Sequence, residues 1–132
     1  MKKQSILAAA LALLGSSAFA ESYQCDFSKG GNRGWIAPVV LVELDADKGT
    51  AAVMDGITRS KQDGWFPAKI SADTKKRYTV SWTVRRLKSS TGQNVNGDFR
   101  LTVQKASLDG TISMLPHGYS NKFTNKGKCK LR

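Results

Sequence analysis

Hydrophobic and polar residues alternate along much of the chain after residue 20, and turn-forming residues recur at short intervals. The alternation is clearest in residues 78–87, where Tyr78, Val80, Trp82 and Val84 fall on one face of an extended chain. A period of two is typical of a β-strand with one face buried, whereas helical periodicity is scarce in this sequence. The pattern therefore predicts an all-β protein built from antiparallel neighbours.

The expected strands are residues 22–27, 35–44, 50–54, 68–72, 78–87, 99–107 and 111–115, followed by a tail from residue 116 to residue 132. Six to eight strands in up-and-down order form a meander that closes as a barrel or folds as a two-layer sandwich. We favour the barrel because closure leaves no exposed strand edge. Residues 88–97 are polar and contain two glycines, so we expect an exposed loop there.

The first twenty residues have the pattern of a secretory signal peptide. Lys2 and Lys3 precede the uncharged apolar run 6–14, and Ala18-Phe19-Ala20 fits the small-x-small pattern of a signal peptidase site. The run is too short to span a bilayer, so no transmembrane anchor is expected. We therefore expect residues 1–20 to be cleaved and residues 21–132 to form a single β-domain, periplasmic or secreted.

The chain has two cysteines, Cys25 and Cys129, one near each end of the expected domain. An even pair in an oxidising compartment, without the spacing of metal ligands, predicts a disulfide that joins the ends. Zinc is a poor alternative, because His117 is the only histidine and a structural zinc needs four ligands. No metal and no cofactor are expected.

Positive charge is concentrated in the second half of the chain. Residues 21–84 hold nine basic and eight acidic residues, whereas residues 85–132 hold ten basic and two acidic ones, so the expected domain has a net charge of +9. Such an asymmetry attracts anions to one side of a small protein. The candidate anion-binding residues are Lys29, Arg33, Arg85, Arg100, Lys126, Lys128 and Lys130. The disulfide would bring the first two beside the last three, where Gly30, Gly31 and Gly127 could also present backbone N–H groups.

These features favour a non-enzymatic binding protein of the cell envelope. The single histidine and the absence of a Gly-x-Ser-x-Gly sequence disfavour hydrolytic machinery. Expected partners are an anionic lipid, a polysaccharide or an acidic protein; nucleic acid is not expected for an exported chain without a nucleic-acid-binding signature. The alternatives are a protein–protein module such as an enzyme inhibitor or a subunit of an envelope complex, a structural domain, and a basic surface that only maintains solubility.

Three segments also carry a resemblance: Gly34-Trp35-Ile36-Ala37-Pro38, the hairpin 47–53 and residues 118–129. With them the chain resembles small exported bacterial proteins of unassigned function, which implies a fold but no active-site residue. In size and compartment it is also similar to the periplasmic inhibitors of c-type lysozymes. Those lysozymes are basic, however, and a net charge of +9 opposes that association.

Overall fold

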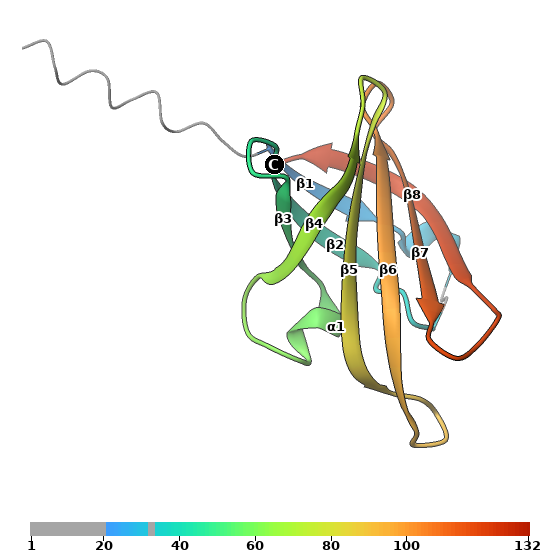
Figure 1. The fold of residues 1–132 in the computed structure, drawn as a ribbon. Helices are drawn as coiled ribbons and strands as arrows, with labels where there is room; N and C mark the ends of the chain where they lie inside the picture. Colours follow the sequence, from blue (N-terminus) through green and yellow to red (C-terminus); the bar gives the residue numbers. More distant parts are fainter. Residues whose placement is uncertain (1–20, 32–33) are drawn as a thin grey trace, which may run out of the picture.

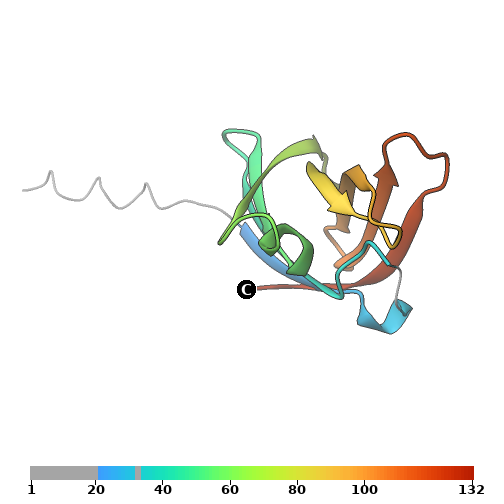
Figure 2. The same ribbon diagram turned by 90° about the horizontal axis from the view of Figure 1, so that it is seen from below.

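The computed structural model describes residues 21–31 and 34–132. Its eight strands form a closed antiparallel barrel in which β1 pairs with both β2 and β8 (Figures 1 and 2). The strands are β1 (Glu21–Asp26), β2 (Val39–Asp45), β3 (Thr50–Met54), β4 (Phe66–Asp73), β5 (Arg77–Lys88), β6 (Asn94–Gln104), β7 (Asp109–Pro116) and β8 (Phe123–Leu131). A 3₁₀ turn, η2 (Ser28–Gly30), and one short helix, α1 (Gly56–Arg59), complete the described elements. The predicted all-β barrel is confirmed.

The period-two pattern has the expected structural meaning. In β5 the side chains of Val80, Trp82 and Val84 are buried inside the barrel, while the intervening positions face outward. The Trp82 and Phe99 rings stack inside with their centroids 5.4 Å apart. The inward side chains of the strands form the hydrophobic core of the barrel, and recesses lie on its outer surface and at its lower end.

The disulfide closes the barrel. Cys25 in β1 and Cys129 in β8 are directly opposite in register and are bonded across the seam between the first and last strands. The bond therefore links residues 104 positions apart in the sequence, as predicted. In the part of the chain that the structure describes, no helix has the length and apolar character needed to cross a bilayer.

Two predicted boundaries were wrong in ways that matter for the surface. Strand β2 begins at Val39, after Pro38, instead of at Trp35, so residues 34–38 form part of a long loop at the lower end of the barrel in Figure 1. The expected loop at 88–97 is shorter, because β5 extends to Lys88 and β6 begins at Asn94. Past an irregularity between Val84 and Leu87, the ladder continues into this hairpin through the pairs Leu87–Val95 and Lys88–Asn94, which alternation alone does not reveal.

Strands β4 and β5 are paired over only part of their length. The last pair in their register is Lys69 with Ser81, yet β4 begins three residues earlier and β5 continues seven residues further. Figure 1 shows β4 curving away from β5 below this point. The separation leaves a recess between the two strands that is lined by Pro67, Ala68, Lys69, Ser81, Trp82 and Thr83.

Candidate functional site

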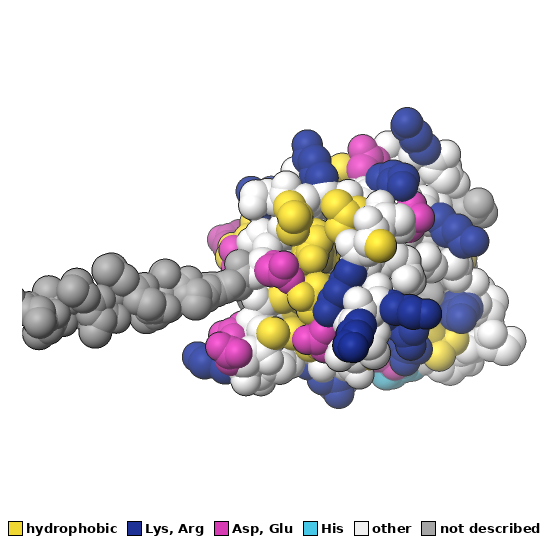
Figure 3. Space-filling model, turned by 90° about the horizontal axis from the view of Figure 1, so that it is seen from above, with side chains coloured by type: hydrophobic (Ala, Val, Ile, Leu, Met, Phe, Trp, Pro, Cys, Tyr) yellow, Lys and Arg dark blue, Asp and Glu magenta, His cyan; other side chains and the backbone are white. Residues whose placement is uncertain are grey.

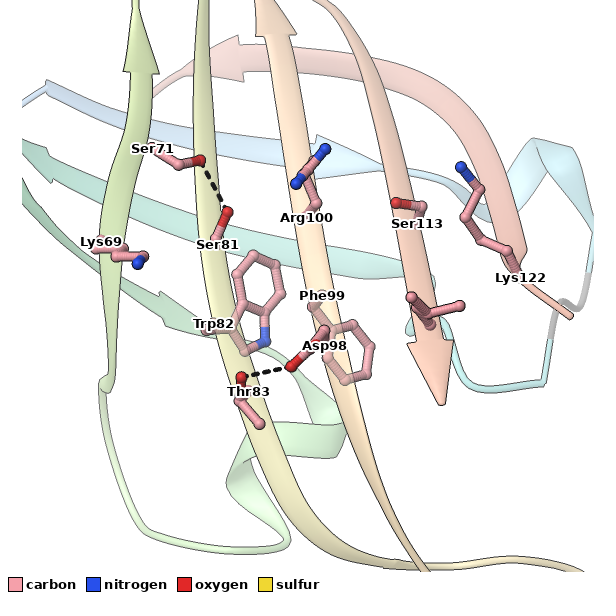
Figure 4. A pocket seen from close by; sticks show the side chains of 11 residues that line it. Lys69, Ser71, Ser81, Trp82, Thr83, Asp98, Phe99, Arg100, Ser113 and Lys122 are labelled. Carbon is pink, nitrogen blue, oxygen red and sulfur yellow. Dashed lines mark hydrogen bonds between the residues drawn. The ribbon is translucent and has the colours of Figure 1, made fainter. Parts of the chain in front are cut away.

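A groove of about 520 Å³ lies on the outer face of strands β4 to β7. We call it the outer groove. Its lining residues are Lys69, Ser71, Ser81, Trp82, Thr83, Asp98, Phe99, Arg100, Ser113, Leu115 and Lys122. Figure 4 shows Lys69 and Lys122 at opposite edges, with Arg100 between them on the central strand β6. It shares four residues with the recess between β4 and β5, so the two form one continuous depression.

The strand register generates the groove's chemistry. Lys69 pairs with Ser81, Ser81 with Arg100, Arg100 with Ser113, and Ser113 with Thr124, which places one outward residue from each of five neighbouring strands in a single row. Cationic and hydroxyl side chains alternate along the first four positions of this row. Because neighbouring strands lie about 4.8 Å apart, the backbone positions of Lys69 and Arg100 are about 10 Å apart.

The three cations of the groove have no acidic partner in the described part of the chain. The ion pairs there join Lys105 to Asp73, His117 to Asp98 and Lys128 to Asp109. Lys69, Arg100 and Lys122 take part in none of them, and all three are exposed. Their positive charge is therefore available to an external anion, as it would not be if a carboxylate of the protein already neutralised it.

Asp98 is the one acidic residue in the groove lining, and its carboxylate contacts Thr83 and His117. Thr83 Oγ1 donates a hydrogen bond of 2.7 Å to Oδ1, and His117 Nε2 lies 2.9 Å from Oδ2. The hydrogen bond from Thr83, together with His117 and the charge of Arg85, lowers the pKa of Asp98 below its ordinary value of 3.8. Asp98 thus remains ionised and connects β5, β6 and the start of the β7–β8 loop.

Hydroxyl groups add hydrogen-bonding capacity between the cations. Ser71 and Ser81 are hydrogen bonded to each other at 2.8 Å, and Ser113 lies on the far side of Arg100. A hydroxyl can donate one hydrogen bond and accept two, so these serine side chains can bind either an anion or a hydroxyl group of a ligand. In residues 21–31 and 34–132, no three His, Cys, Asp or Glu side chains come together as a metal site would require.

Comparison with known protein families, curated proteins and solved structures finds no match for this chain.

Of the predicted anion-binding residues that the structure describes, only Arg100 lines the outer groove. Arg85 is exposed further along the outer face of β5, close enough to influence Asp98 but outside the groove lining. Arg33 lies outside the described residues. Arg85 and Arg100 were expected to share one polar face. Both lie on the outer face of the barrel, but Thr83 and Asp98 lie between them.

The other predicted residues form a separate surface along the seam. Lys126, Lys128 and Lys130 alternate along the exposed face of β8, and we call them the β8 lysine row. Lys29 lies in η2, which packs beside β8, so the disulfide does gather basic residues from both ends. Acidic residues accompany them: Lys128 Nζ lies 2.7 Å from Asp109 Oδ1. Asp26 is also near, and its pKa is lowered by hydrogen bonds from Ser28 and, to a smaller extent, by Lys29 and Lys130.

The glycines of this region do not form the expected anion cradle. The N–H of Gly30 donates to the carbonyl of Phe27 at 3.1 Å, and that of Gly31 to the carbonyl of Ser28 at 3.2 Å. Gly127 lies so close to the backbone carbonyl of Asp26 that no Cβ would fit between them. Gly30 and Gly127 permit close packing of the β1–β2 loop against β8, where the buried Asn125 side chain donates to Phe27 O at 3.1 Å.

Lys69, Lys122 and the serines of the groove were not among the residues predicted from the sequence. Lys69 lies in a stretch where the alternation is weak, and Lys122 lies in the tail without a distinct pattern. The strands that hold Ser81–Thr83 and Arg100 were both predicted, and this was the signal that could have pointed to the groove. Their register was not, and a shift by one residue would have moved Arg100 away from Ser81.

Proposed function

We propose that this protein is a non-enzymatic binding protein of the cell envelope that takes an anionic ligand in the outer groove. The observation that carries the proposal is the set of three cations, Lys69, Arg100 and Lys122, that line one recess without an acidic partner in the described chain. Location in the envelope rests on the expected signal sequence, and the disulfide fits an oxidising compartment.

The groove suits an anion better than the rest of the basic surface does. Arg100 presents a planar guanidinium that can form two parallel hydrogen bonds to a carboxylate, sulfate or phosphate group. Ser81 and Ser113 flank it in the strand register and can donate further hydrogen bonds. Hydrogen bonds to charged groups contribute about 1.5–3 kcal/mol each, more than an exposed ion pair does.

Binding of dextran sulfate to the purified protein, with neutral dextran as the reference, tests the proposal. We expect the protein to bind dextran sulfate and not neutral dextran. Its affinity for dextran sulfate should decrease as the salt concentration rises. The Arg100→Ala variant should lose about tenfold in affinity, because one charged hydrogen-bonding group is worth roughly 1.4 kcal/mol or more.

The matched control is Lys75→Ala, which removes one exposed positive charge at the β4–β5 turn, away from the groove lining. This variant should change the affinity by less than about twofold, the effect of one distant screened charge. Equal losses in the two variants would show that net charge alone attracts the polymer and would reject the groove as the site. Absence of binding to dextran sulfate would also reject the proposal.

A further inference from the structure

A second recess lies at the lower end of the barrel, where three loops meet, and we call it the lower pocket. It encloses about 190 Å³ and is lined by Trp35, Ser89, Thr91, Val95, Pro116, Tyr119, Asn121 and Phe123. Trp35 comes from the long β1–β2 loop, Ser89 and Thr91 from the β5–β6 loop, and Tyr119 and Asn121 from the β7–β8 loop. None of the three loops would form this pocket alone.

The lining combines aromatic rings with small hydrogen-bonding groups. Trp35, Tyr119 and Phe123 supply apolar ring surface, whereas Ser89, Thr91 and Asn121 supply hydroxyl and amide groups. Tyr119 is 49% exposed, although a large aromatic side chain is usually buried in a protein of this size. Its hydroxyl donates to Gln93 Oε1 over 3.4 Å, so the hydroxyl is held only weakly.

The lower pocket and the outer groove share one wall. Leu115 and Lys122 line the groove, while Pro116, Asn121 and Phe123, their immediate neighbours in the chain, line the pocket. Met114 and Phe123 form the last pair of the β7–β8 ladder, so both recesses adjoin the same end of that ladder. His117 fixes this wall to β6 through its contact with Asp98 and through its N–H bond of 2.8 Å to the carbonyl of Asn96. Lys122 of the groove and Tyr119 of the pocket both belong to the β7–β8 loop, which therefore links the two recesses.

We propose that the ligand is an acidic polysaccharide, whose anionic groups bind in the outer groove and one of whose sugar rings stacks in the lower pocket. The inference rests on the proposed function and extends it to the class of ligand and to a second subsite. A sugar ring has an apolar face that packs on aromatic rings and a rim of hydroxyls that matches serine, threonine and asparagine side chains.

The geometry of the groove favours a polymer over a small ion or a membrane. Lys69 and Arg100 are anchored about 10 Å apart on alternate strands, as are Arg100 and the start of β8 that follows Lys122. Two of these long side chains can converge on one phosphate, but the three cations together are spread over about 20 Å of the sheet, a row whose length matches successive acidic sugars. A flat bilayer would meet the rim of the groove and not the half-buried Ser81 beside Arg100.

The test measures binding of galacturonic acid and its oligomers, from the monosaccharide to the hexasaccharide, alongside inorganic phosphate and phosphatidylglycerol vesicles. We expect the affinity to increase steeply with oligomer length. Tyr119→Ala should weaken hexasaccharide binding about fivefold to tenfold, the effect of losing some 50 Å² of ring contact. Tyr119→Phe, which keeps the ring and loses the hydroxyl, is the matched control and should bind within twofold of the wild type.

The possible outcomes distinguish the proposed anion groove from the proposed polysaccharide subsite. Hexasaccharide binding that requires Arg100 but is unchanged by Tyr119→Ala would overturn the sugar subsite. Phosphate or vesicle binding that requires Arg100 and exceeds hexasaccharide binding would overturn the polysaccharide and leave the anion groove intact. If neither these probes nor dextran sulfate bind in a way that depends on Arg100, both proposals fail.

Discussion

The outer groove and the β8 lysine row each present three basic side chains on the outside of one barrel, but their surroundings differ. In the groove, Lys69, Arg100 and Lys122 alternate with hydroxyl groups, and the only lining carboxylate is occupied by Thr83 and His117. Along β8, Lys128 is paired with Asp109, and Asp26 lies near Lys130 and Lys29. Among the described residues, one cation of the β8 lysine row is neutralised by an ion pair, whereas none of the three groove cations is.

The upper end of the barrel also holds basic side chains that have acidic neighbours. In Figure 3, acidic side chains lie among the basic ones around the hydrophobic mouth of the barrel. At this end, Lys105 Nζ lies 2.8 Å from Asp73 Oδ1 and 4.1 Å from the centroid of the Tyr78 ring. Its positive charge is therefore already paired within the fold. Basicity summed over the sequence is thus a weak guide to a binding surface, and the local balance of charge decides.

The largest effect that we expect concerns the seam region beside the β8 lysine row. Replacing both cysteines, as Cys25→Ala with Cys129→Ala, should lower the free energy of unfolding by about 2–5 kcal/mol, because the bond closes a loop of more than a hundred residues. Urea unfolding measures this loss. Under conditions where the variant stays folded, its affinity for dextran sulfate should be unchanged. A parallel loss of affinity would mean that the seam and the groove are not separate regions.

A medium effect is expected from the acidic residue within the groove. Asp98→Asn removes a negative charge near Arg100 and keeps an oxygen that can accept from Thr83, so dextran sulfate should bind about twofold to fivefold more tightly. Titration at fixed salt concentration measures the change. Asp47→Asn in the β2–β3 turn makes the same change in net charge and should have little effect. Equal gains in both variants would contradict a local role for Asp98.

The smallest effect is expected for Asp109→Asn, which breaks the ion pair with Lys128. Lys128, and to a smaller extent Ser107, lowers the pKa of Asp109 below its ordinary value of 3.8. A lowered carboxyl pKa stabilises the fold above that pH, and this contribution is lost as the pH falls below 3.8. The variant should therefore show a slightly weaker loss of stability on acidification than the wild type, measured as the urea midpoint. If it instead gained as much affinity for dextran sulfate as Asp98→Asn, the β8 lysine row would be a binding surface too.

The sequence by itself determined the all-β class and the disulfide, and it favoured a barrel over a two-layer sandwich. Alternation in residues 78–87 identifies the inward side of β5, because the side chains of a strand point to opposite faces at every step. Cys25 and Cys129 predict the disulfide, because two lone cysteines near the ends of an expected exported domain have few other uses. Arg100 was found among the candidate residues because it lies on the polar face of a predicted strand.

Only the tertiary structure decided which cations belong together. Lys69, Arg100 and Lys122 are separated by 31 and 22 positions in the chain, and they meet because of the register of β4 to β8 and the separation of β4 from β5. The pairing of Lys128 with Asp109 arises from the same register. Register depends on contacts between strands, while alternation is a property of each strand alone. The sequence pattern therefore predicts which way a side chain points, and the folded sheet determines what it lies beside.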